Sequence, residues 1–107
     1  MAKDTIVPDV FHAIADPNRR RILELLRQGE MSAGDIVERF DVTFAAISQH
    51  LKILLDADLV GRRTEGRYRV YSVSPEALRT VHEWTEGFRD FWEHRLDRLS
   101  DLLDEEP

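Results

Sequence analysis

The residues best suited to chemistry lie on one face of a helix predicted over residues 43–57. On a helical wheel of about 100° per residue, Gln49 and Lys52 point away from the apolar side. Ala45 lies beside them, and Ser48 lies on the flank. Amide, hydroxyl and ammonium groups hydrogen-bond the edges of DNA bases, and alanines leave room in a groove about 12 Å wide. This face therefore fits a major groove, although an ordinary amphipathic helix with a small, polar outer face shows the same pattern.

The start and the edge of this helix carry further candidate contacts. Thr43 is the expected N-cap, and the free N–H groups of the first turn can bind a phosphate. His50 lies about 60° from the centre of the apolar face, where it either supports the helix or contacts the DNA backbone. The predicted core face consists of Phe44, Ile47, Leu51 and Leu54.

Four arginines form the second candidate set, in the segment VGRRTEGRYRVYSV at residues 60–73. They are Arg62, Arg63, Arg67 and Arg69. The β-branched and aromatic residues of this segment, divided at Glu65-Gly66, predict a β-hairpin with a two-residue or a three-residue loop. Like charges that face each other destabilise a two-stranded ribbon, and phosphates would relieve the repulsion. Helix and hairpin together therefore favour nucleic acid over a merely solvated ribbon.

Composition narrows the remaining possibilities. The 107 residues include no cysteine, which excludes disulfides, thiolate metal sites and cysteine nucleophiles. The four histidines are scattered, and no Ser/His/Asp or glycine-rich phosphate pattern occurs, so we expect neither an enzyme nor a cofactor. No stretch approaches the roughly 20 apolar residues of a membrane span, and we expect a cytoplasmic protein.

The net charge of −6 is unevenly distributed. Residues 1–73 contain 11 basic and 11 acidic side chains, whereas residues 74–107 contain 4 and 10. The excess of acidic residues therefore lies in the C-terminal third. The overall charge does not exclude a nucleic-acid partner.

Start and stop signals place the first helices. A short helix is predicted at residues 10–14. Asp16-Pro17 is a cap followed by proline at the first helical position, and the helix it starts should end at Gly29. Its expected buried stripe is Ile22, Leu25 and Leu26.

Two further caps are predicted from serines. Ser32 is expected to cap a helix over residues 32–40. Ser74, followed by proline, is expected to cap a helix over residues 75–103, which Gly87 can bend. The helices 32–40 and 43–57, followed by the basic hairpin, predict a winged helix-turn-helix.

The predicted fold is thus one domain spanning residues 1–107, mainly α with a two-stranded β-wing. Helix 43–57 is its recognition helix and segment 60–73 its wing. A winged helix that binds protein or RNA is the alternative. A protein-binding wing should expose apolar side chains, whereas this one carries four arginines.

The last predicted helix has an apolar stripe that a small core cannot cover. The stripe consists of Leu78, Val81, Thr85, Phe88, Trp92, Leu96, Leu99 and Leu103, widened by Trp84 and Phe91. Large exposed apolar patches mark interfaces, so we expect a two-fold dimer, an aromatic ligand pocket, or both. A dimer would place two recognition helices one DNA turn apart and would read a pseudo-palindrome.

Three stretches resemble one known family. ADPNRRRILELL, TFAAISQHLKILLDADLV and GRRTEGRYRVYSV are similar to the arsenic-repressor (ArsR/SmtB) family of bacterial winged-helix regulators, over about residues 10–73. The C-terminal stretch resembles a cysteine-poor branch of it. The resemblance implies a homodimeric DNA-binding repressor, with the first and last helices as the dimer interface. The residues implied there are Phe11, Trp84, Phe88, Phe91, Trp92, Leu96 and Leu99.

The resemblance does not extend to the metal sites of that family. The segment that would carry the arsenic-type thiolates, MSAGDIVERF, has no cysteine. The zinc-type site uses two histidines eleven residues apart, whereas His82 and His94 are twelve apart and so about 120° out of register. Thr80 occupies the position before His82 where the family's zinc site has an acidic ligand. We therefore expect no metal site, and an effector, if there is one, would be an unknown small molecule.

Overall fold

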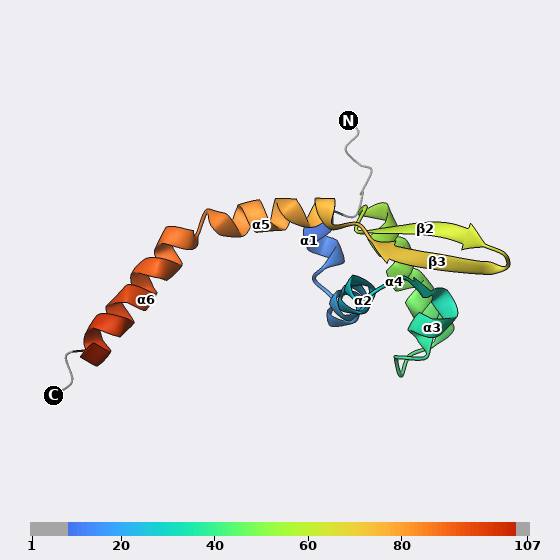
Figure 1. The fold of residues 1–107 in the computed structure, drawn as a ribbon, viewed down its shortest axis with the longest axis horizontal. Helices are drawn as coiled ribbons and strands as arrows, with labels where there is room; N and C mark the ends of the chain where they lie inside the picture. Colours follow the sequence, from blue (N-terminus) through green and yellow to red (C-terminus); the bar gives the residue numbers. More distant parts are fainter. Residues whose placement is uncertain (1–8, 105–107) are drawn as a thin grey trace.

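The computed structural model describes residues 9–104, which form a helical body, a projecting hairpin and two C-terminal helices (Figure 1). The elements in chain order are α1 (Val10–Ala13), α2 (Pro17–Arg27), β1 (Met31–Ser32), α3 (Ala33–Val37), α4 (Phe44–Asp56), β2 (Val60–Glu65), β3 (Tyr68–Val73), the 3-10 turn η2 (Pro75–Ala77), α5 (Leu78–Glu86) and α6 (Arg89–Asp104). Within residues 9–104 no helix has both the length and the apolar character needed to cross a membrane.

Three of the four predicted N-caps are confirmed. The Asp16 carboxylate accepts hydrogen bonds from two backbone N–H groups of α2, at 2.8 and 3.1 Å. Ser32 Oγ accepts the N–H of Asp35 at 3.2 Å, and Thr43 Oγ1 accepts that of Ala46 at 3.0 Å. The prediction for Ser74 is wrong, because its side chain makes no cap hydrogen bond and the chain begins a 3-10 turn there. α3 is also shorter than predicted, ending at Val37.

The predicted hairpin is confirmed, and a third strand joins it. β1 pairs with β3, so that the antiparallel sheet has the order β1-β3-β2. Glu65 pairs with Tyr68, which leaves a two-residue loop of Gly66 and Arg67. Gly66 has φ +64° while Arg67 has a negative φ, the pattern of a type II′ turn, which suits the twist of hairpins.

The core lies between α2, α3, α4 and the base of the sheet. Its largest fully buried side chains are Ile22, Ile36, Ile47, Leu51, Leu54 and Leu59. Phe44 is a correction to the predicted core face, since its side chain is 60% exposed. It occupies the first position of α4, and the buried cluster begins one turn later at Ile47.

The single C-terminal helix predicted over residues 75–103 is divided. Gly87 and Phe88 separate α5 from α6, and their N–H groups bond to the carbonyls three residues back, at 3.2 and 2.9 Å. α5 packs on α1, where the rings of Phe11 and Trp84 meet edge to face at 5.6 Å. α6 leads away from the body at an angle to α5, as Figure 1 shows, and none of its side chains from 89 to 104 is buried.

Candidate nucleic-acid interface

The outer face of α4 is open to solvent, as its sequence predicts. Ile47, Leu51 and Leu54 anchor the opposite face in the core. The predicted contact residues Ala45, Ser48, Gln49 and Lys52 are all exposed. Lys52 Nζ lies 3.3 Å from the carboxylate of Asp56 one turn on, and such an exposed pair is weak and readily exchanged for a phosphate.

His50 faces the body of the protein instead of the outer face of α4. Its Nδ1 lies 3.2 Å from Nη1 of Arg19, and because a guanidinium only donates, Nδ1 is the acceptor. Of the two roles considered for His50, this geometry favours support of the helix.

Arg19 is a buried cation that sequence reasoning missed. Its side chain also donates to the carbonyl oxygens of Ala13 at 2.7 Å and His12 at 3.1 Å. It therefore joins the end of α1 to α4 through His50. In the sequence it is one of three consecutive arginines, and nothing in their types distinguishes the buried one.

The wing places its arginines on different faces. Cross-strand partners share a face of the sheet, and here Arg62 faces Tyr71, Arg63 faces Val70 and Thr64 faces Arg69. The expected opposition of like charges is therefore wrong. Tyr71 is buried, so Arg62 and Arg69 lie on the face that continues from the core.

Arg63 lies on the other face and is engaged by two carboxylates, those of Glu30 and Glu65. Its hydrogen bond with Glu30 raises the pKa of the Arg63 guanidinium and lowers the pKa of the Glu30 carboxyl. By contrast, no carboxylate in residues 9–104 forms an ion pair with Arg62, Arg67 or Arg69.

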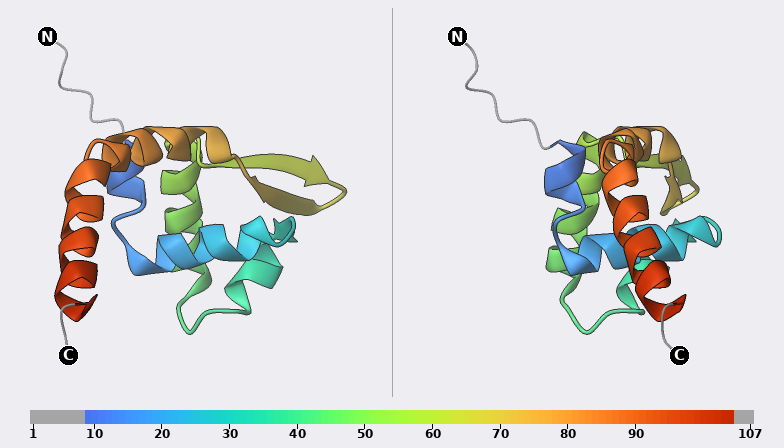
Figure 2. Two further views of the ribbon diagram at one scale, coloured as in Figure 1. Left: turned by 60° about the vertical axis from the view of Figure 1, so that its left-hand side comes forward. Right: turned by 90° about the vertical axis from the view of Figure 1, so that its left-hand side faces the viewer.

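A groove runs between α4 and the wing, and we call it the helix–wing groove. It has a volume of about 330 Å³. Its lining residues are Ser32, Ala33, Gly34, Phe44, Ser48, Leu51, Arg67, Tyr68, Arg69 and Tyr71. Figures 1 and 2 show the hairpin projecting from the helical body on the same side as α3. The groove thus joins exposed residues of α4 to two arginines of the wing.

Comparisons with known proteins agree with this architecture. The model of the family described as bacterial regulatory protein, arsR family, matches residues 16–61. The transcriptional repressor SdpR of Bacillus subtilis is 41% identical over 80 residues, covering 75% of this chain and 89% of the relative. The chain belongs to the arsR family.

Two further relatives match most of this arsR-family chain. The regulator Rv2034 of Mycobacterium tuberculosis is 36% identical over 100 residues, covering 92% of this chain and 91% of the relative. The solved structure of an ArsR-like transcriptional regulator from Rhodococcus sp. RHA1 superimposes with a TM-score of 0.70 at 28% identity, covering 92% and 90% of the two chains. The protein is therefore a winged-helix transcriptional regulator.

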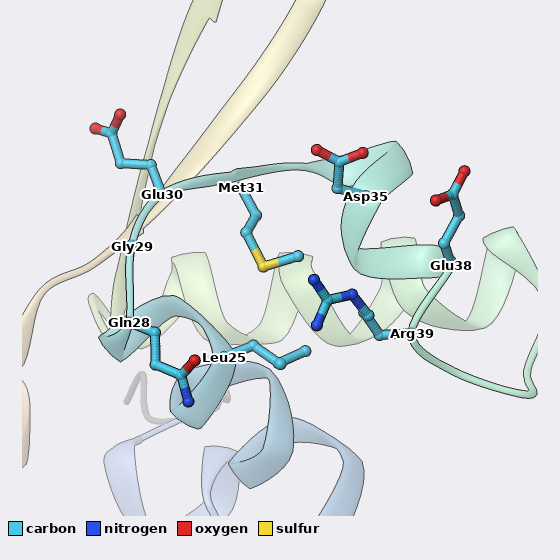
Figure 3. A pocket seen from close by; sticks show the side chains of 8 residues that line it. All are labelled: Leu25, Gln28, Gly29, Glu30, Met31, Asp35, Glu38 and Arg39. Atoms are coloured by element: carbon cyan, nitrogen blue, oxygen red, sulfur yellow. The ribbon is translucent and has the colours of Figure 1, made fainter.

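A second hollow of this arsR-family protein lies between the end of α2, β1 and α3 (Figure 3). Its volume is about 430 Å³, and three carboxylates, those of Glu30, Asp35 and Glu38, stand along it. Figure 3 shows that they do not point toward a common centre. Within residues 9–104 no group of three His, Cys, Asp or Glu side chains is arranged to hold a metal ion.

The two histidines considered as zinc ligands lie on different helices. His82 is on α5, where its Nε2 is 3.6 Å from the carboxylate of Glu86. His94 is exposed on α6, beyond the break at Gly87. The two histidines therefore do not share one continuous helix.

Proposed function

We propose that this arsR-family regulator is a homodimeric repressor that reads a pseudo-palindromic operator in double-stranded DNA. The observation that carries the proposal is the continuity of the exposed face of α4 with the helix–wing groove. A duplex seated there meets hydrogen-bonding side chains from the helix and guanidinium groups from the wing. Relatives named as transcriptional repressors support the direction of regulation.

The side chains of α4 divide into base-reading and phosphate-binding groups. Gln49 can pair with an adenine edge through both atoms of its amide, and Ser48 can donate to or accept from a base. Lys52 can reach a guanine or a phosphate once it leaves Asp56. The first turn, capped by Thr43, offers backbone N–H groups to a phosphate, and Ala45 gives clearance.

The wing supplies charge to the flanking backbone. Arg62, Arg67 and Arg69 have no ion-pair partner among the described carboxylates, so phosphates can engage them without displacing one. Arg63 must first leave Glu30 and Glu65. We therefore rank Arg63 as the weakest phosphate contact of the four.

The dimer is proposed from apolar side chains that the described chain leaves uncovered. Phe11, Trp84 and Phe88 form a row of edge-to-face rings at 5.6 and 5.2 Å, and all three are exposed. Phe91, Trp92, Leu96 and Leu99 continue the apolar surface along α6, and each is more than half exposed. A second copy of the chain can cover this surface and present two recognition helices about 34 Å apart.

Selection of duplexes from a randomised pool tests the function, because no operator sequence has to be chosen in advance. Wild-type protein should enrich an inverted repeat. Gln49→Ala should flatten preference among variants of that repeat more than it weakens non-specific binding. Arg67→Ala should weaken all sequences alike and reduce the slope of log affinity against log salt by about one. Unchanged preference in Gln49→Ala would contradict the base-reading role, and failure to enrich any sequence would contradict the function.

A further inference from the structure

An aromatic side chain stands uncovered at the start of the recognition helix. Phe44 is the first residue of α4, and its side chain is 60% exposed. Ile47 and Leu51, further along the helix, are fully buried. A phenyl ring left in water forgoes the free energy of burial, so a partner that covers it gains affinity.

The surroundings of Phe44 indicate the chemistry of that partner. Phe44 lines the helix–wing groove together with Ser48, Arg67 and Arg69. Phe44 and Ser48 are four residues apart and so about 40° apart around α4, on its wing-facing edge. A matching occupant of the groove would therefore offer negative charge to the two guanidinium groups and an apolar group to the ring of Phe44.

Thymine in a DNA duplex meets both requirements. Phosphates flank the major groove, and the C5-methyl of thymine is the apolar group that the bases present within it. Recognition helices contact base edges with their N-terminal residues, and Phe44 occupies the first helical position. The Thr43 cap, at 3.0 Å from the N–H of Ala46, fixes the backbone of that first turn.

We infer that Phe44 reads a thymine methyl group in each half-site of the operator. The inference rests on the proposed function and adds a specificity-determining residue to it. The operator then carries a thymine that Phe44 covers, next to the base pairs contacted by Ser48. Without the ring, the protein loses its ability to distinguish thymine from uracil at that position.

Replacement of thymine by deoxyuridine tests the contact, since it removes only the methyl group. Each thymine of the selected operator is replaced in turn, and affinity is measured by fluorescence anisotropy. The affinity of the wild-type protein should fall about fourfold at one position per half-site, which is the effect of removing one buried methyl group. The loss of affinity should reach about fifteenfold when both half-sites carry the change, since the free-energy changes of two separate sites add.

The same duplexes are then titrated with variants. Phe44→Ala should bind the thymine and uracil operators equally, whereas Phe44→Leu should retain part of the discrimination. Ala45→Gly tests the competing assignment, because an alanine methyl can also contact thymine. Loss of the thymine preference in Ala45→Gly, with the preference retained in Phe44→Ala, would assign the methyl contact to Ala45. Phe44 lies outside the buried core, so thermal unfolding of Phe44→Ala should match that of wild type.

Three outcomes would overturn the inference. The first is a wild-type protein that prefers one sequence yet is indifferent to every thymine methyl. The second is discrimination that persists in Phe44→Ala at unchanged affinity, which would assign the methyl contact to another residue. The third is a Phe44→Ala protein that binds both operators more weakly with the discrimination intact, which is the signature of a merely structural ring. Failure of the proposed function itself is different, because wild-type protein would then show no sequence preference at all.

Discussion

Asp16 shows how one side chain serves both a helix start and the placement of a neighbouring helix. Its carboxylate caps α2 through the N–H groups of Asn18 and Arg19, at 2.8 and 3.1 Å. It also lies 3.9 Å from Nε2 of His50 on α4. Partial burial raises its pKa, but the two backbone hydrogen bonds, together with electrostatic interactions with His50 and Arg19, have the larger effect and hold it below the ordinary value of 3.8.

The cap should make a pH-dependent contribution to stability. Asp16→Ala should lower the free energy of unfolding at neutral pH by about 1 kcal/mol, as loss of an N-cap usually does. A pKa lowered by folding gives stability that is present above the unfolded-state value and is lost as pH falls through the folded-state value. The difference between wild type and variant should therefore shrink below about pH 4. Urea unfolding between pH 2 and 7 measures it.

Asp16→Asn is the matched control for that experiment, since asparagine also caps helices but carries no charge. It should lose less stability than Asp16→Ala at neutral pH, and its stability relative to Asp16→Ala should vary little with pH. A wild-type advantage over Asp16→Ala that stays constant down to pH 2 would show that the charge of Asp16 contributes nothing.

At the scale of elements, the features predictable from sequence are those fixed by local chemistry. The caps at Asp16, Ser32 and Thr43, and the hairpin over residues 60–73, depend on residues adjacent in the chain. β1 is different, because a two-residue strand exists only through its pairing with β3, 40 residues away along the chain at Met31 and Tyr71. A two-residue strand such as β1 cannot be predicted from its local sequence.

The burial of two side chains, Phe44 and Arg19, also depends on tertiary packing and could not be predicted from the local sequence. A helical wheel places Phe44 on the apolar side, but it cannot say where along the helix the core begins. Arg19 is a charged residue whose burial requires carbonyl acceptors from α1 and a histidine from α4. By contrast, the exposed face of α4 followed directly from its period, and Ala45, Ser48, Gln49 and Lys52 are exposed as predicted.

An ion pair with a nearby carboxylate makes one arginine of the wing less available to a phosphate. Glu30 precedes β1 and holds Arg63 of β2. Because that pairing lowers the pKa of Glu30, its carboxylate stays charged at neutral pH. Glu30→Gln should leave Arg63 paired with Glu65 alone and thus more available to a phosphate, so operator affinity should rise several-fold and the salt slope should steepen by up to about one. Titration of the operator at several salt concentrations measures both.

The control for this release is Glu24→Gln, which removes the same charge from an exposed position on α2. It should raise affinity only through the change in net charge, with a smaller effect on the salt slope. Equal effects of the two variants would mean that Glu30 acts through general repulsion of DNA and does not hold Arg63 back.

At the scale of the molecule, α6 carries an apolar stripe that the described residues leave exposed. The described residues extend over 66 × 42 × 22 Å, and α6 lies at one end, away from the core (Figure 1). An isolated helix of about this length is marginal in water, so packing of its apolar face against the proposed second copy would stabilise it. The C-terminal segment is also acidic and would repel phosphates, which agrees with the proposed binding of DNA on the α4 side.

Trp92 is the side chain through which the proposed dimer can be tested. It is 56% exposed, so Trp92→Ala should leave the core of the protomer intact while it removes a large apolar contact between copies. Sedimentation should shift toward monomer, and operator affinity should fall with it, because a monomer binds one half-site only. Asp101 lies on the opposite side of α6, about 180° away from Trp92. The control variant Asp101→Ala should therefore remain dimeric. If Trp92→Ala sediments as wild type does at micromolar concentration, the partner surface lies elsewhere, and the row formed by Phe11, Trp84 and Phe88 becomes the place to look.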